Sequence, residues 1–538
     1  MANLSKIKRD ELLAFIDKLK EKNKDDESIR SLNEIANTLT EKKYGLVWEK
    51  HTEKVDEMLE HNIPVFEEVE ERKIKVDDSN EYNFLLEGDN LHSLKLLEKT
   101  HKGKIDVIYI DPPYNTKNKE FIYNDTMIGE EDAYRHSKWL SFMSERLELA
   151  KELLSDTGLI FISIDENQFS QLKLLCDEIY GENNYVTTFI RKTKSMTGDD
   201  GNGLNIQHEY LHCYSKNEEK ILFIGENKTF SEYKNPDNDP NGDWVSADPS
   251  AKSGGDSTYF SITNPITGQV DYPPKGRYWA FSEDTMKKYI ETGRIKFKDT
   301  IRNNQRGFIF KRYKENLQAD YMPVGTLVFT EVNYMTSVAT KELKQFINNI
   351  KFDYPKPIDF IKKIVGYISK NNSIILDFFA GSGTTGHAVM QLNKEDGGNR
   401  KYILCTNNEN NICEEVTYQR LKNIQEDLPH NLKYYKTEFI PKFSDEEDSI
   451  SNKMMKHIKE LIELEYHIEL DGKKYLILED EDKLTEAIEK IENNGRLFVR
   501  SGIFLSRSDQ RILDDKQVNV IEIPDYYFRD ELKEVGEL

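Results

Sequence analysis

Four consecutive residues, Asp111-Pro112-Pro113-Tyr114, combine groups that could do chemistry on an amino group. They follow residues 107–110, a short apolar run of the length that is typical of a buried strand in a parallel sheet. Two consecutive prolines lack N–H donors and restrict φ, so the chain must leave the sheet there. We therefore expect Asp111 at the carboxyl end of a strand, where open α/β sheets bind ligands.

The amino group of a nucleobase is a poor nucleophile, because its lone pair is delocalised into the ring. The carboxylate of Asp111 and the carbonyl of Pro112 can each accept one amino hydrogen, which favours a lone pair that points at an electrophile. Pro113 keeps the turn rigid, and Tyr114 offers a flat face on which an extruded base can stack. These four residues are the catalytic candidates. The alternative is an acidic strand end followed by a turn without a chemical role.

A second stretch, residues 373–385, predicts a strand, a glycine-rich turn and the start of a helix. Gly381 and Gly383 permit positive φ and a close approach of the backbone to a ligand. Thr384 or Thr385 can cap the helix that follows. An ordinary strand–turn–helix would look similar, and a lone G-x-G is weak evidence. The combination of this turn with Asp-Pro-Pro-Tyr is much more specific than either motif alone.

Together the two motifs resemble the DNA amino-methyltransferases that use S-adenosyl-L-methionine, and their order resembles the β class of that family. Segments across residues 45–440 sharpen the resemblance to the methylation (Mod) subunits of Type III restriction–modification systems; they are residues 111–116, 120–125, 139–143, 162–165 and 208–210. The resemblance implies a doubly wound, mostly parallel Rossmann-like α/β sheet. It also implies methylation of adenine N6 in double-stranded DNA after base flipping. The partners it implies are a second copy of the chain and a restriction (Res) helicase–nuclease subunit.

The resemblance also assigns residues to the cofactor. The family carries a Gly-Asp that faces the cofactor's adenine, which matches Asp89 and its neighbour Asn90; the alternative is that Asp89 only caps a helix. Lys356 matches a Lys-Pro close to the cofactor's carboxylate. Thr406 or Asn407 stands where an acid usually holds the ribose, so the ribose contact stays open. The full set of cofactor candidates is Asp89, Asn90, Lys356, Asp377, Phe379, Ala380, Gly381, Ser382, Gly383, Thr384 and Asn407.

The motifs, the composition and the family resemblance together divide the 538 residues into five expected regions. We expect an N-terminal helical region at 1–75, which is either an oligomer contact or a packed cap. The methyltransferase domain would be split into a catalytic half at 76–189 and a cofactor-binding half at 351–440. The slot between them, 190–350, holds the target-recognition domain of the resembled family. Residues 441–538 would form a C-terminal α/β module, in which no catalytic motif occurs.

The net charge of −22 argues mildly against a nucleic-acid partner, but the distribution of charge decides. Residues 287–314 contain ten basic and two acidic side chains. Such a run can contact phosphates while polar groups read base edges; the alternative is a solvated basic helix in an insertion. The candidates for DNA contact are Arg294, Lys298, Arg302, Arg306, Lys311 and Arg312.

Several other functions are disfavoured. The absence of an apolar run of about 18 residues and of a signal-peptide pattern predicts a soluble cytoplasmic protein without a membrane partner. The four cysteines lack C-x-x-C spacing, which predicts reduced thiols. His208 and His212 fit the H-E-x-x-H pattern of zinc peptidases, but their segment is expected to be a strand, which separates them by roughly 13 Å. We therefore expect no metal.

No P-loop or nuclease signature occurs, so DNA cleavage would need another subunit. The alternatives to a Type III modification subunit are a solitary DNA methyltransferase, an enzyme acting on cytosine N4, and a catalytically silent DNA-recognition subunit. An aspartate before Pro-Pro-Tyr favours adenine in the resembled family. The intact Asp111 and Gly381-Ser382-Gly383 argue against a silent copy.

Overall fold

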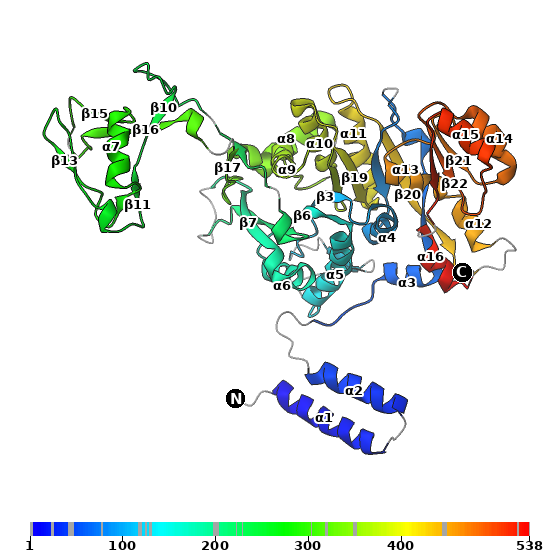
Figure 1. Cartoon of the computed structure of the whole chain (residues 1–538). Coiled ribbons are helices and arrows are strands. Elements are labelled where there is room, and N and C mark those ends of the chain that lie inside the picture. The colour runs from blue at the N-terminus through cyan, green and yellow to red at the C-terminus, as the bar shows by residue number, and fades with distance from the viewer. Residues whose placement is uncertain are drawn as a thin grey trace. The chain divides into compact units, whose positions relative to one another are not determined.

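The structure is a computed structural model of the whole chain. It describes all residues except 1–3, 23–25, 41–47, 77–78, 117–120, 124–125, 129–131, 197–203, 222, 229, 303, 318–320, 348–351, 444–448, 525–526 and 537–538. Its backbone divides into two compact units (Figure 1). The main unit comprises Met1–Phe223 and Thr326–Leu538, and the inserted unit is Ile224–Gly325.

A nine-stranded sheet in the order β1-β20-β2-β19-β18-β3-β6-β8-β7 organises the main unit. All neighbours from β20 to β6 are parallel, whereas β1 and β8 run antiparallel to the strands beside them. The strands are β1 Asn62–Glu68, β2 Asn83–Glu87, β3 Ile105–Ile110, β6 Leu154–Ile164, β7 Tyr185–Lys192, β8 His208–Ser215, β18 Ile374–Asp377, β19 Lys401–Thr406 and β20 Leu432–Pro441. The predicted doubly wound, mostly parallel sheet is confirmed.

Helices cover this sheet in two groups (Figure 1). In one group α4 (Asn90–His101), α5 (Arg135–Leu153) and α6 (Phe169–Tyr180) pack against one another. In the other group α10 (Thr384–Asp396) packs against α9 (Ile358–Gly366) and α11 (Tyr418–Asn423), and α8 (Thr336–Phe346) packs against α11. The strands between them are buried on both faces, as continuous apolar runs in parallel sheets require.

The chain changes direction across the sheet between β18 and β3. From β18 the crossover through α10 leads to β19 on one side, and from β3 the crossover through α5 leads to β6 on the other side. Right-handed crossovers in opposite directions place their helices on opposite faces and leave a crevice at the carboxyl ends of the two central strands. Asp111 follows β3 and Phe378 follows β18, so both predicted motifs border this crevice.

The N-terminal region is helical, as expected, only up to residue 61. Its helices are α1 (Leu4–Lys22), α2 (Asp26–Thr40), which packs against α1, and α3 (Lys54–His61). The next residues form β1, which pairs with β20 at the edge of the main sheet. The predicted boundary at residue 75 therefore lies beyond a strand of the main sheet.

The C-terminal region contains a small parallel sheet of β21 (Tyr475–Leu478), β22 (Arg496–Val499) and β23 (Asn519–Glu522), with α14 (Leu484–Lys490) and α15 (Arg507–Asp515). These elements form a small α/β arrangement. It is not a separate compact unit, however, because α12 (Ile450–Met455) and α13 (Ile458–Tyr466) bury side chains in the main core.

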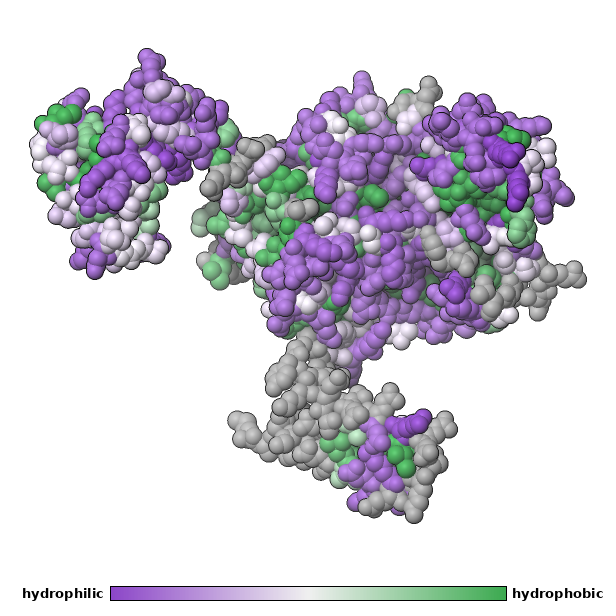
Figure 2. Space-filling model, in the orientation of Figure 1, coloured by the Kyte–Doolittle hydropathy of each residue, from purple (hydrophilic) through white to green (hydrophobic). Residues whose placement is uncertain are grey.

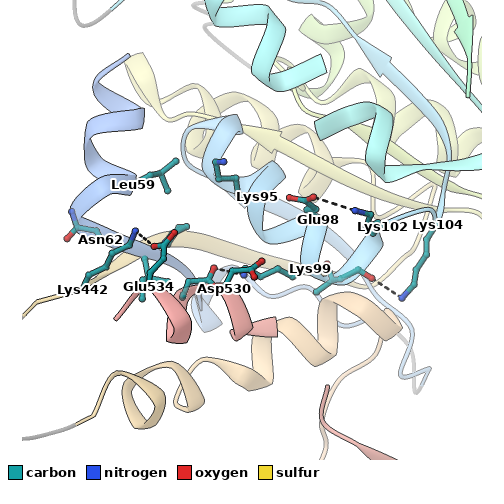
Figure 3. A pocket seen from close by; sticks show the side chains of 14 residues that line it. Leu59, Asn62, Lys95, Glu98, Lys99, Lys102, Lys104, Lys442, Asp530 and Glu534 are labelled. Carbon is teal, nitrogen blue, oxygen red and sulfur yellow. Dashed lines mark hydrogen bonds and ion pairs between the residues drawn. The ribbon is translucent and has the colours of Figure 1, made fainter. Parts of the chain in front are cut away.

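The last helix, α16 (Arg529–Glu534), is joined to the main unit by ion pairs around a cavity of about 710 Å³ (Figure 3). Lys99 pairs with Glu531, and Lys442 pairs with Glu534 at 2.6 Å. The lining residue Lys104 precedes β3, so this cavity lies at the amino end of that strand. It is therefore at the opposite edge of the sheet from Asp111, and its ion pairs hold the C-terminal helix in place.

The inserted unit has its own small core of aromatic and aliphatic residues, including Trp279, Met286, Phe308 and Phe310. It contains helix α7 (Glu283–Glu291) and a sheet of β10 (Trp244–Ala247), β16 (Phe308–Tyr313) and β15 (Ile295–Phe297). Short strand pairs complete it: β9 Glu226–Asn227 with β17 Tyr321–Met322, β11 Ser250–Ala251 with β14 Tyr278–Trp279, and β12 Ile262–Thr263 with β13 Val270–Asp271.

The predicted target-recognition region, 190–350, is wider than this unit. Strand β8 lies within the predicted range but pairs with β6 of the main sheet, and β7 extends into it. In the main unit, β4 (Phe121–Tyr123) and β5 (Thr126–Ile128) pair as a separate two-stranded antiparallel sheet. The face shown in Figure 2 is mostly hydrophilic. Within the described parts of the chain, no helix is long and apolar enough to span a membrane. All four cysteines are free and buried.

Candidate active site

The turn after β3 is held rigidly by the residues around it. The hydroxyl of Tyr114 donates to Asp111 Oδ1 at 2.9 Å, and the indole of Trp139 on α5 donates to the carbonyl of Pro113 at 2.7 Å. Trp139 is fully buried, so its hydrogen bond to the Pro113 carbonyl restrains the turn. The Asp111 side chain remains 26% exposed, which leaves its carboxylate within reach of a substrate.

Lys356 lies at this turn. We expected it at the cofactor's carboxylate, but its ammonium donates to Asp111 Oδ2 at 2.5 Å and to the Tyr114 hydroxyl at 3.1 Å. It also lies 3.7 Å from Oε1 of Glu209 on β8, a residue that sequence reasoning missed. Glu209 accepts a hydrogen bond from Tyr114 at 3.2 Å, so all four side chains belong to one network.

Arg191 on β7 balances the charge of this network, and it too was missed. Its guanidinium pairs with Glu209 at 2.6 Å, and both side chains are almost fully buried. Burial alone would raise the pKa of Glu209, but Arg191 and Lys356 outweigh it and hold that pKa below its usual value. Burial beside Asp111 raises the pKa of Tyr114, which keeps its hydroxyl a donor. Two carboxylates and two cations therefore meet here with no net formal charge.

The glycine turn after β18 has the predicted backbone. Gly381 and Gly383 have φ of 48° and 72°, in the left-handed region that glycine favours. A Cβ at these positions would meet Phe352 at 2.9 Å and Thr417 at 3.2 Å, so the close neighbours on that side are the chain's own residues. Gly383 is the N-cap of α10, and the threonine caps that we expected are not used.

Asp377 is buried, and its carboxylate binds residues of the glycine turn and the start of α10. Its carboxylate accepts hydrogen bonds from the Phe379 amide at 3.0 Å and from the Thr385 hydroxyl. Burial raises the pKa of Asp377 to about 7. Among the other predicted turn residues, Ala380 donates its amide to the Cys405 carbonyl, and Phe379 and Gly381 are half-exposed.

Arg420 on α11 is a further residue that no motif indicated. Its buried guanidinium donates to the Ser382 carbonyl at 3.3 Å and to the Thr384 hydroxyl at 2.7 Å. Burial lowers the pKa of Arg420 to about 10. The Thr417 hydroxyl donates to the Gly381 carbonyl at 2.6 Å. The turn is thus fixed from behind by side chains from the segment after β19.

The Asp89 and Asn90 pair lies beside the same turn. The Asn90 amide donates to the Phe378 carbonyl at 2.9 Å. Arg146, buried on α5, donates to Asp89 at 3.1 Å and pairs with Glu53 at 2.8 Å. Asp89 also accepts from the amide of the second residue of α4, so it caps that helix, as the alternative interpretation expects; its role at the cofactor stays a prediction. Asn407 is exposed just beyond β19, at the neighbouring strand end.

The six cations predicted to contact DNA differ in their surroundings within the inserted unit. Lys311 is buried between Asp237 and Asp239, because it faces inward on β16, and it is not available to a phosphate. Arg306 pairs with Asp248 at 2.8 Å. Arg294 is half-buried over aromatic rings, and Lys298 is also half-buried. Arg302 and Arg312 are exposed, Arg312 on the face of β16 opposite to Lys311.

Residues 208–212 lie in strand β8, so the rejected zinc-peptidase geometry does not form. His212 is buried and hydrogen-bonds Thr188 at 2.7 Å. In the part of the chain that the structure describes, no group of three or more His, Cys, Asp or Glu side chains could hold a metal ion.

Comparison with known proteins identifies the family. A family model described as DNA methylase matches residues 105–419, which include both motifs and the network around Asp111. The chain belongs to the DNA methylase family. The resemblance predicted from Asp-Pro-Pro-Tyr and the glycine turn is therefore confirmed at the level of the family.

Three relatives of this DNA methylase illustrate the range of similar proteins. The Type III StyLTI Mod subunit of Salmonella typhimurium is 35% identical over 391 residues, 66% of this chain and 57% of that protein. The Type III EcoPI Mod subunit of Escherichia phage P1 is 31% identical over 386 residues, 61% of this chain and 58% of that protein. The Type II methyltransferase M.KpnI of Klebsiella pneumoniae is 33% identical over 389 residues, 66% of this chain and 90% of that protein. The chain thus matches less than two thirds of either Mod subunit.

Proposed function

We propose that the chain transfers a methyl group from S-adenosyl-L-methionine to N6 of a flipped adenine in a specific double-stranded DNA sequence. The observation that carries this proposal is the position of Asp111 and Tyr114 beside the glycine turn, at the point where the strand order of the sheet reverses. Membership of the DNA methylase family supports it.

The residues around the crevice fit the cofactor. Phe379 and Gly381 are half-exposed after β18, and the Asp89 carboxylate, 32% exposed, is held beside them through Asn90 and Arg146. An apolar ring, a glycine backbone and a carboxylate suit a ligand with a flat base, hydroxyl groups and a cationic centre. Asn407 is the candidate for the ribose. When bound, the cofactor supplies a methyl group carried on a sulfonium. After transfer of the methyl group, the remainder of the cofactor leaves as a neutral thioether.

The chain's own residues prepare the amino group. Asp111 and the Pro112 carbonyl would accept its two hydrogens, which frees the nitrogen lone pair to form the new bond to carbon. Tyr114 fixes the Asp111 carboxylate and lines the place of the base. The nitrogen becomes positively charged as its bond to carbon forms, and the half-exposed Asp111 stabilises that charge until the surplus proton leaves to water.

The family model is named for both N6 and N4 methylases, so it does not distinguish adenine from cytosine. The choice of adenine is therefore part of the proposal. The aspartate of Asp-Pro-Pro-Tyr favours adenine over cytosine N4. The inserted unit is the proposed target-recognition domain, with Arg302 and Arg312 as its exposed cations.

We further propose that the chain is the modification subunit of a Type III system, with a Res helicase–nuclease subunit as its partner. The similarity to the StyLTI and EcoPI Mod subunits favours this role. A solitary methyltransferase is the second candidate, because the Type II enzyme M.KpnI is matched over 90% of its length.

A homodimer also remains a proposal, which the exposed Leu12, Phe15 and Ile35 of α1 and α2 favour. The cytoplasmic location stays a prediction.

The experiment is to incubate the purified chain with unmethylated DNA and labelled S-adenosyl-L-methionine and to identify the product nucleoside by mass spectrometry. We expect N6-methyladenine at one sequence. N4-methylcytosine would contradict the choice of acceptor. Absence of transfer, in the presence of measurable DNA binding, would support the silent recognition subunit instead.

A further inference from the structure

The ammonium of Lys356 lies between two carboxylates. It is 2.5 Å from Asp111 Oδ2 and 3.7 Å from Glu209 Oε1, and its side chain is only 8% exposed. The catalytic candidate Asp111 is thus ion-paired to Lys356, and a second carboxylate lies within reach of the same cation.

This arrangement conflicts with the task proposed for Asp111. As the amino nitrogen forms its new bond, positive charge develops on it, and Asp111 must stabilise that charge. An ammonium in contact with Asp111 cancels the carboxylate's field there and repels the developing charge. The reaction therefore requires that Lys356 withdraw from Asp111 without becoming an unpaired buried cation, which would be costly.

Glu209 meets the requirements for a second partner. It is nearly buried, it is ionised because Arg191 and Lys356 lower its pKa, and Arg191 fixes it at 2.6 Å. Arg191 is itself held by the Tyr334 carbonyl at 2.8 Å. Because Glu209 does not have to move, Lys356 can exchange one carboxylate for the other through a short displacement of its flexible side chain.

We propose that Glu209 is a positioning residue that receives the Lys356 ammonium when the substrate amino group occupies Asp111. The inference rests on the proposed function and adds a step to it. The exchange breaks no covalent bond and moves no proton; one ion pair replaces another. In the absence of substrate, Lys356 neutralises Asp111, and the four charged groups stay balanced.

The test is the substitution Glu209→Gln, which keeps the shape of the side chain and removes its charge. Among the residues that the structure describes, Asp111 is then the carboxylate that still pairs with Lys356. We expect kcat to fall by about 30-fold, within the range of coupled charged neighbours, while calorimetric affinity for S-adenosyl-L-methionine changes less than about twofold. Glu463→Gln is the matched control, because Glu463 is also buried and binds a lysine, Lys433, at 2.6 Å and a tyrosine, Tyr435, at 2.6 Å. The control should lower the Tm and leave kcat unchanged.

A second variant separates positioning from folding. Adding Lys356→Met to Glu209→Gln removes the ammonium that blocks Asp111, so kcat should rise about fivefold or more above that of the single variant. A purely structural Glu209 predicts a double variant no faster than the single one, and that result would overturn the inference. A Glu209→Gln enzyme within threefold of wild-type kcat would overturn it as well (threefold being about 0.7 kcal/mol). A wild-type enzyme that transfers no methyl group would instead contradict the proposed function and, with it, this inference.

Discussion

The Thr384 hydroxyl donates a hydrogen bond to the carbonyl of Lys356 at 3.1 Å. Thr384 is the first residue of α10 after the glycine turn, and Lys356 carries the ammonium that pairs with Asp111. The predicted cofactor motif and the predicted catalytic motif are therefore joined through Lys356, whose carbonyl binds Thr384 and whose ammonium binds Asp111, although residues 111 and 384 lie far apart in the chain.

Thr384→Val should disturb both sites at once. Valine keeps the shape of threonine but cannot donate to the Lys356 carbonyl or accept from Arg420. We expect kcat and cofactor affinity to fall together, each by about 3- to 30-fold, as the loss of buried hydrogen bonds predicts. Thr340→Val is the control, because the Thr340 hydroxyl donates to the Thr336 carbonyl of its own helix, α8. Loss of affinity with unchanged kcat would show that the two sites are independent.

The glycine turn can be tested by its backbone conformation. Gly383 has φ of 72°, so Gly383→Val should destabilise the chain by about 1–3 kcal/mol and weaken cofactor binding. Gly383→Asn is the matched variant, because asparagine tolerates the left-handed region. We expect thermal unfolding to show a clearly smaller loss for asparagine than for valine. Equal losses would mean that the space beside Thr417, and not φ, limits this position.

The buried Asp377 predicts a pH dependence of stability. Its pKa is about 7 in the folded chain, above its usual value, so folding favours the protonated form. The resulting stability is present at low pH and is lost as pH rises through about 7, by about 2 kcal/mol between pH 5 and pH 8. Asp377→Asn removes this titration. The Tm of the variant relative to wild type should therefore increase from pH 5 to pH 8, and a constant difference would argue against the raised pKa.

Much of this site could be predicted from local sequence. The turn after β3 and the glycine turn after β18 follow from prolines, glycines and apolar runs that act over a few residues. Glu209, Arg191 and Arg420 carry no such signal, because each reaches the site from a distant strand or helix and is identified only by burial and contact. The segment 208–210 was part of the family resemblance, but its glutamate was not assigned a role.

The basic run shows the opposite error. The number of charges along residues 287–314 does not distinguish one cation from another. Successive side chains of β16 point to opposite faces of the sheet, so Lys311 is buried and Arg312 is exposed. Lys311 is neutralised by two aspartates, Asp237 and Asp239, which lie in a loop far earlier in the chain. Strand β1 was missed for a similar reason, since its partner β20 lies about 370 to 380 residues later in the chain. The register pairs Asn62 with Pro441 and Glu68 with Tyr435.

The exposed cations of the inserted unit provide a test of DNA recognition. Arg302→Ala together with Arg312→Ala should weaken DNA binding and reduce the log–log salt slope by about one unit for each lost phosphate contact. Cofactor affinity should not change. Lys490→Ala, which removes an exposed lysine of the C-terminal module, is the control and should alter neither value. An unchanged salt slope in the double variant would place DNA contact elsewhere.

The role proposed for Asp111 at the substrate amino group can be measured through single-turnover methyl transfer by Asp111→Asn. Asparagine keeps the size of the side chain but loses the charge that stabilises the reacting nitrogen. With DNA and S-adenosyl-L-methionine both at saturating concentrations, we expect a rate at least about 100-fold below wild type, with DNA and cofactor affinities preserved. A rate within about tenfold of wild type (about 1.4 kcal/mol) would contradict it.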